Sequence, residues 1–153
     1  MVRGIILLKI FINDKQYRSF IKYAINTCES FSLVFEKDDI NRSKYIFQEI
    51  YESIYEFIFI ENSIGYHPDT GSFFQNVEII YCECNKYTEA LLQSSYSIFD
   101  WNGEKMPEEL CFYRDDKKWF TCVCHEKYLF IYDEIEDDIE FFKKEKIKYF
   151  YTF

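Results

Sequence analysis

Residues that break regular structure are scarce in this sequence. Its 153 residues include four Gly and two Pro, which excludes the glycine- and proline-rich classes of fibrous or low-complexity chain. Apolar residues make up 48% of the chain and aromatic residues 22%. Disordered chains lack such content, because the entropy cost of ordering a backbone must be offset by burying apolar groups. We therefore expect a folded protein.

Long apolar runs are missing as well. The apolar N-terminal stretch, residues 5–12, is interrupted by Lys9 and is shorter than the ~20 apolar residues that a membrane span needs. No small-residue cleavage site follows it, so it lacks the anatomy of a signal peptide. We therefore expect a cytoplasmic protein without a membrane segment. Six Cys without a secretion signal predict a reducing compartment and free thiols.

Recognisable catalytic motifs are also absent. The sequence contains no glycine-rich phosphate loop, no His-Glu-x-x-His and no nucleophile elbow. Cys124 and His125 are adjacent, but neighbours on a strand face opposite sides of a sheet, which counts against a Cys–His nucleophile. The sequence favours a protein that is not an enzyme, with no catalytic residues and no cofactor. A Cys- or His-dependent enzyme is the alternative.

The charge of the chain is strongly negative. Twenty-seven Asp and Glu against eighteen Lys and Arg give a formal net charge of −9. Such a protein repels phosphate backbones and anionic lipid, so we expect neither non-specific nucleic-acid binding nor membrane binding. Solubility alone accounts for such a charge. The sharper interpretation is a protein partner with a basic surface.

Periodicity predicts four helices in one domain that covers residues 1–153. The clearest begins at Asn13 or Asp14 and runs to about Cys28, because its apolar residues recur at the spacing of one buried helix face. The other three are expected at residues 42–57, 86–97 and 133–144, with the alternative that residues 57–60 open a strand. The acidic run in the last of them is expected to be a solvated helix face or, alternatively, a docking surface. Its members are Glu134, Glu136, Asp137, Asp138 and Glu140.

Alternating and aromatic-rich segments predict the strands. They are residues 5–12, 30–36, 73–84, 110–113, 119–124, 128–132 and 147–153. Residues 61–72 contain two Gly and a Pro and predict a loop. The strands between residues 110 and 132 are separated at hairpin lengths and predict a meander. We expect an α+β fold, a single-domain sandwich with a mainly antiparallel sheet and about four helices packed on it.

Two Cys-x-Cys pairs suggest a metal or redox site. They are Cys82 with Cys84 and Cys122 with Cys124, and zinc prefers thiolate ligands. On a strand the Cα atoms of such a pair lie ~6–7 Å apart, whereas zinc ligands usually stand two to four residues apart on a turn. Buried Cys also packs as a small hydrophobe. Core packing is the favoured interpretation, and these four residues are weak metal candidates.

The most distinctive stretch for recognition is residues 99–126, which contains both Trp. On a regular strand Trp119 and His125 face the same side, opposite to Phe120 and Cys122. An indole beside an imidazole, a carboxylate and a guanidinium makes a recognition site, because Trp and Arg dominate binding hot spots. The alternative is that both rings pack under a helix. The candidate ligand- or partner-binding residues are Trp101, Arg114, Trp119, His125 and Glu126.

The same stretch carries a resemblance to known proteins. Asp100-Trp101, the segment Pro107-Glu108-Glu109-Leu110-Cys111-Phe112, Trp119 and His125-Glu126 resemble a group of small proteins of low-GC Gram-positive bacteria and their mobile elements. Some of these are labelled stage III sporulation protein AH. The resemblance covers the C-terminal third. It implies no established activity and carries over no catalytic residue.

These observations support two main functional hypotheses. The first is a small, acidic, non-catalytic binding protein that recognises or inhibits another macromolecule, as toxin-immunity proteins and defence antagonists do. The second is a small-ligand or nucleotide-signal binding protein with a pocket near Trp119 and His125, where a local Arg holds an anion despite the acidic exterior.

Overall fold

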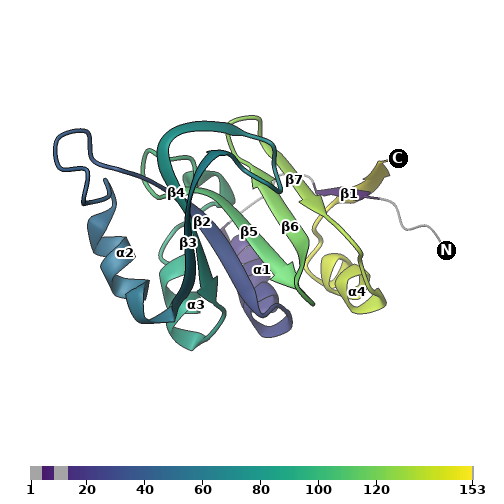
Figure 1. Cartoon of the computed structure of the whole chain (residues 1–153). Helices are drawn as coiled ribbons and strands as arrows, with labels where there is room; N and C mark the ends of the chain where they lie inside the picture. Colours follow the sequence, from purple (N-terminus) through teal and green to yellow (C-terminus); the bar gives the residue numbers. More distant parts are fainter. Residues whose placement is uncertain (1–4, 9–13, 153) are drawn as a thin grey trace.

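A single sheet of eight strands and four α-helices form the computed structural model, which describes residues 5–8 and 14–152 (Figure 1). The strand order is β3-β4-β2-β5-β6-β7-β1-β8, and every pairing is antiparallel. The expected α+β fold with a mainly antiparallel sheet is confirmed. The strands are β1 (Ile5–Leu8), β2 (Ser30–Glu36), β3 (Ile58–Tyr66), β4 (Phe73–Glu83), β5 (Glu108–Arg114), β6 (Lys117–Val123), β7 (Tyr128–Ile131) and β8 (Tyr149–Thr152).

Among the described helices, α1 is the longest. They are α1 (Asp14–Thr27), α2 (Gln48–Ile54), α3 (Lys86–Leu92) and α4 (Glu136–Lys144), with 3-10 turns η1 (Tyr55–Phe57) and η2 (Ile98–Asp100). Across the described residues, no helix combines the length and the apolarity needed to cross a membrane.

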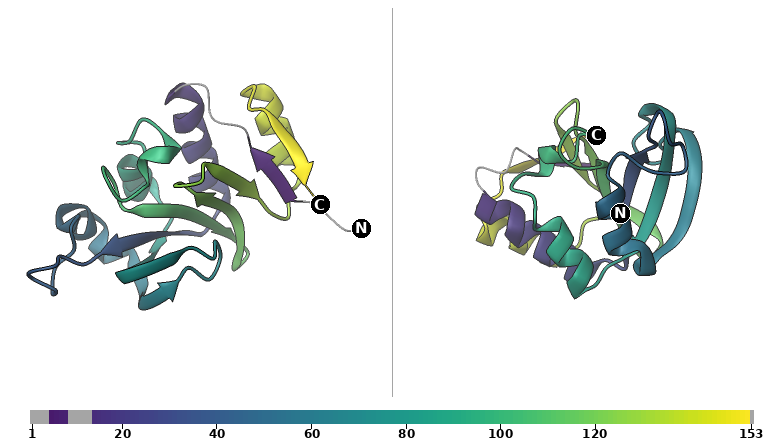
Figure 2. Two further views of the ribbon diagram at one scale, coloured as in Figure 1. Left: turned by 90° about the horizontal axis from the view of Figure 1, so that it is seen from above. Right: turned by 90° about the vertical axis from the view of Figure 1, so that its left-hand side faces the viewer.

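The main core lies between the sheet and α1, α3 and α4, which lie on one side of it (Figures 1 and 2). The predicted inner face of α1 is confirmed, and its Phe20 ring lies 4.8 Å from Phe120 of β6. The second face of the sheet carries a smaller cluster of Val34, Val77 and Ile79. The hairpin of β3 and β4 curls over this face, so β2 is buried on both sides.

The predicted meander is confirmed as β5, β6 and β7, with one irregularity that changes the expected site. Phe112 pairs with Phe120, but Tyr113 pairs with Lys118, which leaves Trp119 as an extra residue in β6. A bulge of this kind turns a side chain to the other face. Trp119 therefore lies on the helix side, beside Phe120, and the prediction that it shares a face with His125 was wrong.

The helix predicted at residues 42–57 begins later than expected, at Gln48, and continues from α2 into the 3-10 turn η1. The polar break before it is longer than expected, because Asp38 accepts hydrogen bonds from the amides of Ile40 and Asn41 and Lys37 forms an isolated bridge with Tyr45. Only α2 is α-helical. The predicted loop at residues 61–72 was also wrong in its first half, because β3 pairs with β4 from Ile58 to Tyr66.

The remaining boundaries differ from the predictions at their ends. Asn85 caps α3 as expected, since its side chain accepts hydrogen bonds from the amides of Tyr87 and Thr88, but the helix ends at Leu92. Helix α4 begins at Glu136 and β8 at Tyr149. Residues 9–12 of the first predicted strand, the Asn13 cap and Phe153 of the last strand lie outside the described residues.

The expectation of six free thiols was wrong. Cys122 and Cys124 form a disulfide, and Cys28, Cys82, Cys84 and Cys111 are free. The strand spacing assumed for the pair does not apply, because β6 ends at Val123 and the chain turns at Cys124, which brings the two Cα atoms to 5.3 Å. Core packing is confirmed for Cys28, Cys82 and Cys111, each at most 7% exposed.

Candidate functional site

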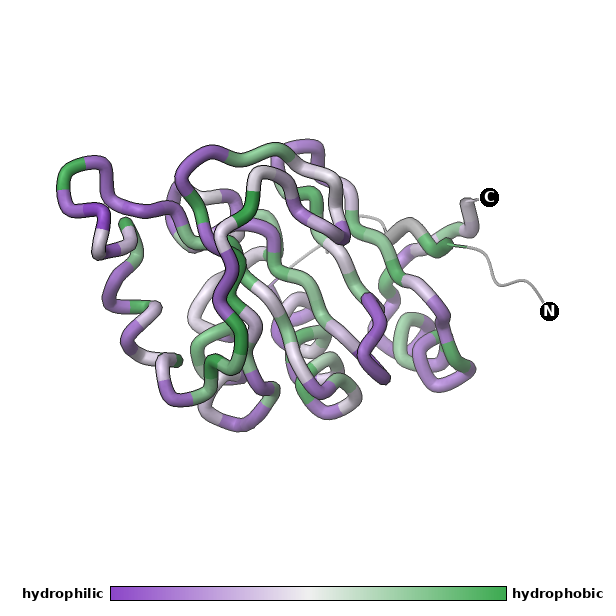
Figure 3. The backbone as a smooth tube through the Cα atoms, viewed as in Figure 1, coloured by the Kyte–Doolittle hydropathy of each residue, from purple (hydrophilic) through white to green (hydrophobic). Residues whose placement is uncertain are grey.

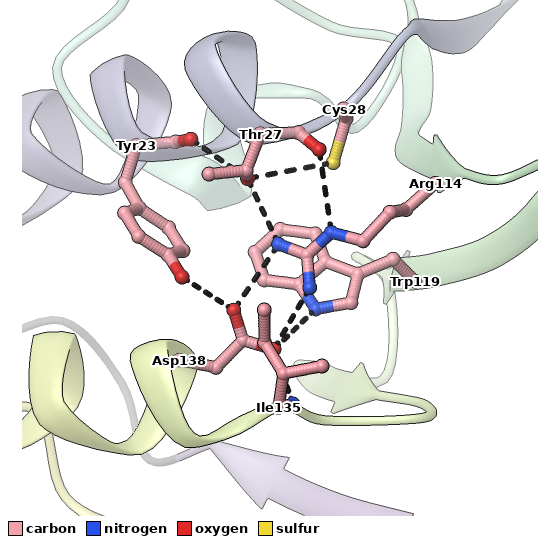
Figure 4. Close-up of polar contacts among 7 residues, drawn as sticks. All are labelled: Tyr23, Thr27, Cys28, Arg114, Trp119, Ile135 and Asp138. Carbon is pink, nitrogen blue, oxygen red and sulfur yellow. Dashed lines mark hydrogen bonds and ion pairs between the residues drawn. The ribbon is translucent and has the colours of Figure 1, made fainter.

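Two of the predicted site residues, Arg114 and Trp119, meet at one buried carboxylate (Figure 4). Asp138 of α4 is fully buried and accepts hydrogen bonds from Arg114 at 2.9 and 3.1 Å, from Trp119 Nε1 at 3.0 Å and from the Tyr23 hydroxyl at 2.5 Å. The amide of Ile135 donates to it as well, which satisfies an N-terminal group of the helix. The prediction that the acidic run of α4 is a solvated face was therefore wrong at Asp138.

The Arg114 guanidinium completes a network across four elements. It lies 4.4 Å from the Trp119 ring and donates to the Thr27 carbonyl and hydroxyl oxygens of α1. Burial alone would raise the pKa of Asp138, but the hydrogen bonds from Arg114 lower it below its usual range. The Arg114 guanidinium thus uses almost all of its donors within the protein. The network holds α1, α4, β5 and β6 together.

The other three predicted residues lie elsewhere. Trp101 is buried and donates from Nε1 to the Tyr17 hydroxyl at 2.9 Å. His125 and Glu126 lie in the turn after β6, and the exposed His125 ring contacts Glu108 at 2.8 Å. His125 lies beyond the end of β6, whereas Trp119 lies within it on the helix side of the sheet. The five candidate residues thus do not converge on one site.

A Cys–His pair that the sequence did not predict lies under the β3–β4 hairpin. His67 Nε2 is 3.9 Å from Cys111 Sγ, and both residues are fully buried. The amides of Asp69 and Thr70 donate to His67 Nδ1, so the proton of the neutral ring is on Nε2 and points at the sulfur. Burial lowers the pKa of His67 to about 4 and raises the pKa of Cys111 well above its usual range. This pair lacks the base that a nucleophilic thiol needs.

A buried carboxylate lies next to that pair. Glu109, 1% exposed, accepts hydrogen bonds from the hydroxyls of Thr70 and Ser72, and burial raises its pKa. Its backbone has a φ of 51°, at the bulge where β5 shifts register against β2. Like His67, Glu109 anchors the hairpin tip to β5. The sequence offered no local signal for this pairing, because the partners stand 37 to 44 residues apart.

A pocket of about 410 Å³ opens beside Arg114 and Trp119. Lys117 and Lys118 also line it, but Asp115 and Asp133 offset them, and Asp138 already neutralises Arg114. Neither His125 nor Glu126 lines this pocket. Its charges are balanced rather than basic, which weakens the case for an anion site here.

The strongest candidate for recognition is a surface on α2, η1 and β3. From residue 45 to residue 85 the sequence contains no Lys or Arg and seven Asp or Glu, so no basic residue within this segment offsets its negative charge. Hydrophilic and hydrophobic residues are intermixed along α2 and β3 (Figure 3). We define the acidic–aromatic surface by its exposed residues Glu49, Glu52, Tyr55, Glu56, Phe59, Ile60 and Glu61.

The acidic–aromatic surface exposes large apolar groups as well as charge. Tyr55 is 63% exposed, Phe59 57% and Ile60 43%. They line a shallow groove of about 440 Å³ together with Glu56 and Glu61. Strand β3 ends the sheet's strand order and is exposed along most of its length. An exposed edge strand with aromatic side chains is a template for partner binding.

Among the described residues, no group of three or more His, Cys, Asp or Glu side chains could hold a metal ion. Comparisons with known proteins find no matching family model, no matching curated protein and no matching solved structure. The resemblance of the C-terminal third therefore stays a prediction, and the functional argument rests on the residues themselves.

Proposed function

We propose that this protein is a non-catalytic binding protein that recognises a basic protein partner through the acidic–aromatic surface. The observation that carries the proposal is the coincidence, on α2 and β3, of exposed rings with a 41-residue stretch that has seven acidic residues and no Lys or Arg. A toxin-immunity or defence-antagonist protein is the most specific form of this proposal.

Each component of the surface has a distinct effect on binding. The carboxylates attract a basic partner over a Debye length of ~10 Å and speed its association. The rings of Tyr55 and Phe59 supply apolar area, and large aromatic side chains dominate binding hot spots. The outer edge of β3 offers backbone N–H and C=O groups to an extended segment. Together they favour an extended, positively charged segment as the part of the partner that binds.

The tip of the β3–β4 hairpin carries two further exposed aromatic residues. Tyr66 and Phe73 are 62% and 87% exposed, and their rings lie 6.2 Å apart. Exposed aromatic pairs of this kind are costly to leave in water, because each ring presents a large apolar area. They favour a partner that covers more of the hairpin than the groove alone.

The test compares two variants with the same change in net charge. E49Q/E52Q/E56Q removes three of the four carboxylates of the surface, and E104Q/E126Q/E140Q removes three exposed carboxylates elsewhere. A partner is first captured from the organism that carries the gene, then purified, and its affinity for each variant is measured by calorimetry. The surface variant is expected to bind at least roughly tenfold more weakly, and the control to bind within about twofold of the original protein. Equal affinities of the two variants would contradict the proposal.

A second candidate is a small-ligand protein that uses the pocket beside Arg114 and Trp119. The cavity of about 410 Å³ and its two lysines favour it. A ligand that binds only the native state raises the melting temperature. Thermal shifts with a panel of nucleotides that disappear in a K117A/K118A variant would support this candidate, and an unchanged melting temperature with every compound would argue against it.

A further inference from the structure

A second cavity, of about 350 Å³, opens on the second face of the sheet beside the acidic–aromatic surface. Phe59 and Ile60 line both this cavity and the groove of that surface. Its other walls come from β4, β5, the start of β2 and two turns, and the lining residues are Ser30, Phe59, Ile60, Pro68, Asp69, Tyr81, Tyr113 and Asp116. We call it the aromatic pocket.

Three aromatic rings form consecutive walls of the aromatic pocket. The Tyr81 ring lies 5.6 Å from the Tyr113 ring and 6.5 Å from the Phe59 ring. Their planes are tilted against each other by 52° and 42°, so neighbouring rings meet at an angle instead of stacking face to face. Phe59 is the most exposed of the three rings, at 57%, and the faces of aromatic rings attract cations.

Two carboxylates complete the aromatic pocket. Asp69 accepts a hydrogen bond from the Tyr113 hydroxyl through Oδ2 at 2.6 Å. Within residues 5–8 and 14–152 its Oδ1 accepts no hydrogen bond, and neither Asp69 nor Asp116 forms an ion pair. The lining includes no Lys or Arg. Among the described residues the pocket therefore combines aromatic rings with two carboxylates that form no ion pair.

The nearest lysines do not occupy this site. Lys117 and Lys118 line a neighbouring cavity of about 420 Å³ that shares Asp69 and Asp116. The Lys118 ammonium lies over the Tyr132 ring, 4.5 Å from its centroid. This contact is an example, within the chain, of the cation–ring recognition that the aromatic pocket offers to another molecule.

We infer that the aromatic pocket binds an alkylammonium group, and that this group is a lysine side chain of the basic partner. The inference rests on the proposed function, because the groove that receives the partner and the aromatic pocket share Phe59 and Ile60. A lysine side chain fits the chemistry of the site. Its methylene stem packs against the rings that line the pocket, and its ammonium group reaches the two carboxylates.

The direct test titrates lysine probes into the isotope-labelled protein and follows amide shifts by NMR. Nα-acetyl-lysine amide is expected to shift the amides of Phe59, Tyr81 and Tyr113 in the original protein. Nα,Nε-diacetyl-lysine amide, which keeps the stem but loses the charge, is expected to bind at least about tenfold more weakly. Equal binding of the two probes, or shifts confined to other strands, would overturn the inference.

Matched variants assign the binding to the two carboxylates. D69N and D116N are each expected to lower the affinity for the lysine probe by roughly three- to tenfold. D115N, in the same turn but outside the pocket, is expected to leave this affinity unchanged. D116N is the second variant because Asp116 makes no hydrogen bond to the hairpin, so its loss does not disturb the fold. An unchanged affinity in both D69N and D116N would overturn the inference.

A third probe separates a partner's side chain from a free metabolite. Choline carries a similar cation without a peptide backbone. Tighter binding of choline than of the lysine probe would show that the pocket binds a free amine and not a lysine side chain of the partner. The outcomes also separate the two proposals. If the captured partner loses affinity for E49Q/E52Q/E56Q but not for D69N and D116N, the function stands and the pocket assignment fails. If the lysine probe binds but the partner binds E49Q/E52Q/E56Q as tightly as the original protein, the pocket assignment stands and the proposed function fails.

Discussion

Tyr113 donates a hydrogen bond to Asp69 over 2.6 Å, and this bond joins strand β5 to the tip of the β3–β4 hairpin. The Tyr113 hydroxyl also contacts the buried Ser32 hydroxyl at 3.0 Å. The hairpin is thereby held over the second face of the sheet, with the aromatic pocket beneath it. This polar contact adds to the apolar cluster of Val34, Val77 and Ile79 on the same face.

The first prediction concerns that tether. The Y113F variant keeps the ring but removes the hydroxyl, which leaves Asp69 and Ser32 without this partner. We expect the free energy of unfolding to fall by about 1.5–3 kcal/mol, the usual range for a hydrogen bond to a charged group. Urea unfolding followed by circular dichroism measures it. The same stability in Y113F and the original protein would show that the tether contributes nothing.

The buried ion pair gives the second prediction. Arg114 and Asp138 have side chains only 12% and 0% exposed, so removing Asp138 leaves a buried cation without a counter-charge. We expect D138A to lower the free energy of unfolding by about 3–5 kcal/mol. The double variant R114M/D138A is expected to be more stable than D138A, because it removes the unpaired charge. A D137A control on the exposed side of α4 is expected to change little.

The pH dependence of stability gives the third prediction. Burial lowers the pKa of His67 from 6.5 to about 4, so between these values the unfolded chain binds a proton that the folded chain excludes. The free energy of unfolding therefore falls as the pH falls through this window, by about 3 kcal/mol in total from His67. The raised pKa of Glu109 acts in the opposite sense, because protonating it favours the folded state.

An H67Q variant isolates the contribution of His67 from that of Glu109. The comparison uses urea unfolding of both proteins at several pH values between 7 and about 4. The difference in stability between the original protein and H67Q is expected to shrink as the pH falls. A difference that stays constant with pH would mean that His67 titrates normally in the folded state.

Thiol chemistry supplies the fourth prediction. Four thiols are free and two sulfurs are joined, so denatured protein is expected to titrate four thiols before reduction and six after it. In the native state all four are expected to react slowly, because burial raises the pKa of each of them. One thiol that alkylates much faster than the others at neutral pH would instead favour the Cys-dependent enzyme.

Local patterns in the sequence predicted most of the fold but not the site. The buried face of α1, the cap at Asn85 and the meander follow from short-range periodicity and turn spacing. The bulge at Trp119 arises from the pairing of β6 with β5, and no local pattern marks it. It moved Trp119 away from His125 and so divided the expected recognition site.

The missed elements share one physical cause, which is contact between segments distant in sequence. Strand β3 lacks the alternation of a half-buried strand because it is exposed almost throughout, and only its pairing with β4 defines it. Likewise, the sequence does not distinguish Asp138 from the other acidic residues of its run, so it was predicted to be solvated. Only the fold brings Arg114 to within 2.9 Å of it. The sequence shows that residues 45–85 are acidic, but it does not show which of their side chains share one exposed surface.

The most direct test of the central claim is the association rate of the purified partner as a function of ionic strength. Between about 0.01 M and 0.15 M the Debye length falls from about 30 Å to about 8 Å. If the acidic–aromatic surface attracts a basic segment, the rate falls steeply over this range, and E49Q/E52Q/E56Q reduces both the rate at low salt and the steepness of the fall. A rate independent of salt, or the same salt dependence in that variant as in the original protein, would contradict the account.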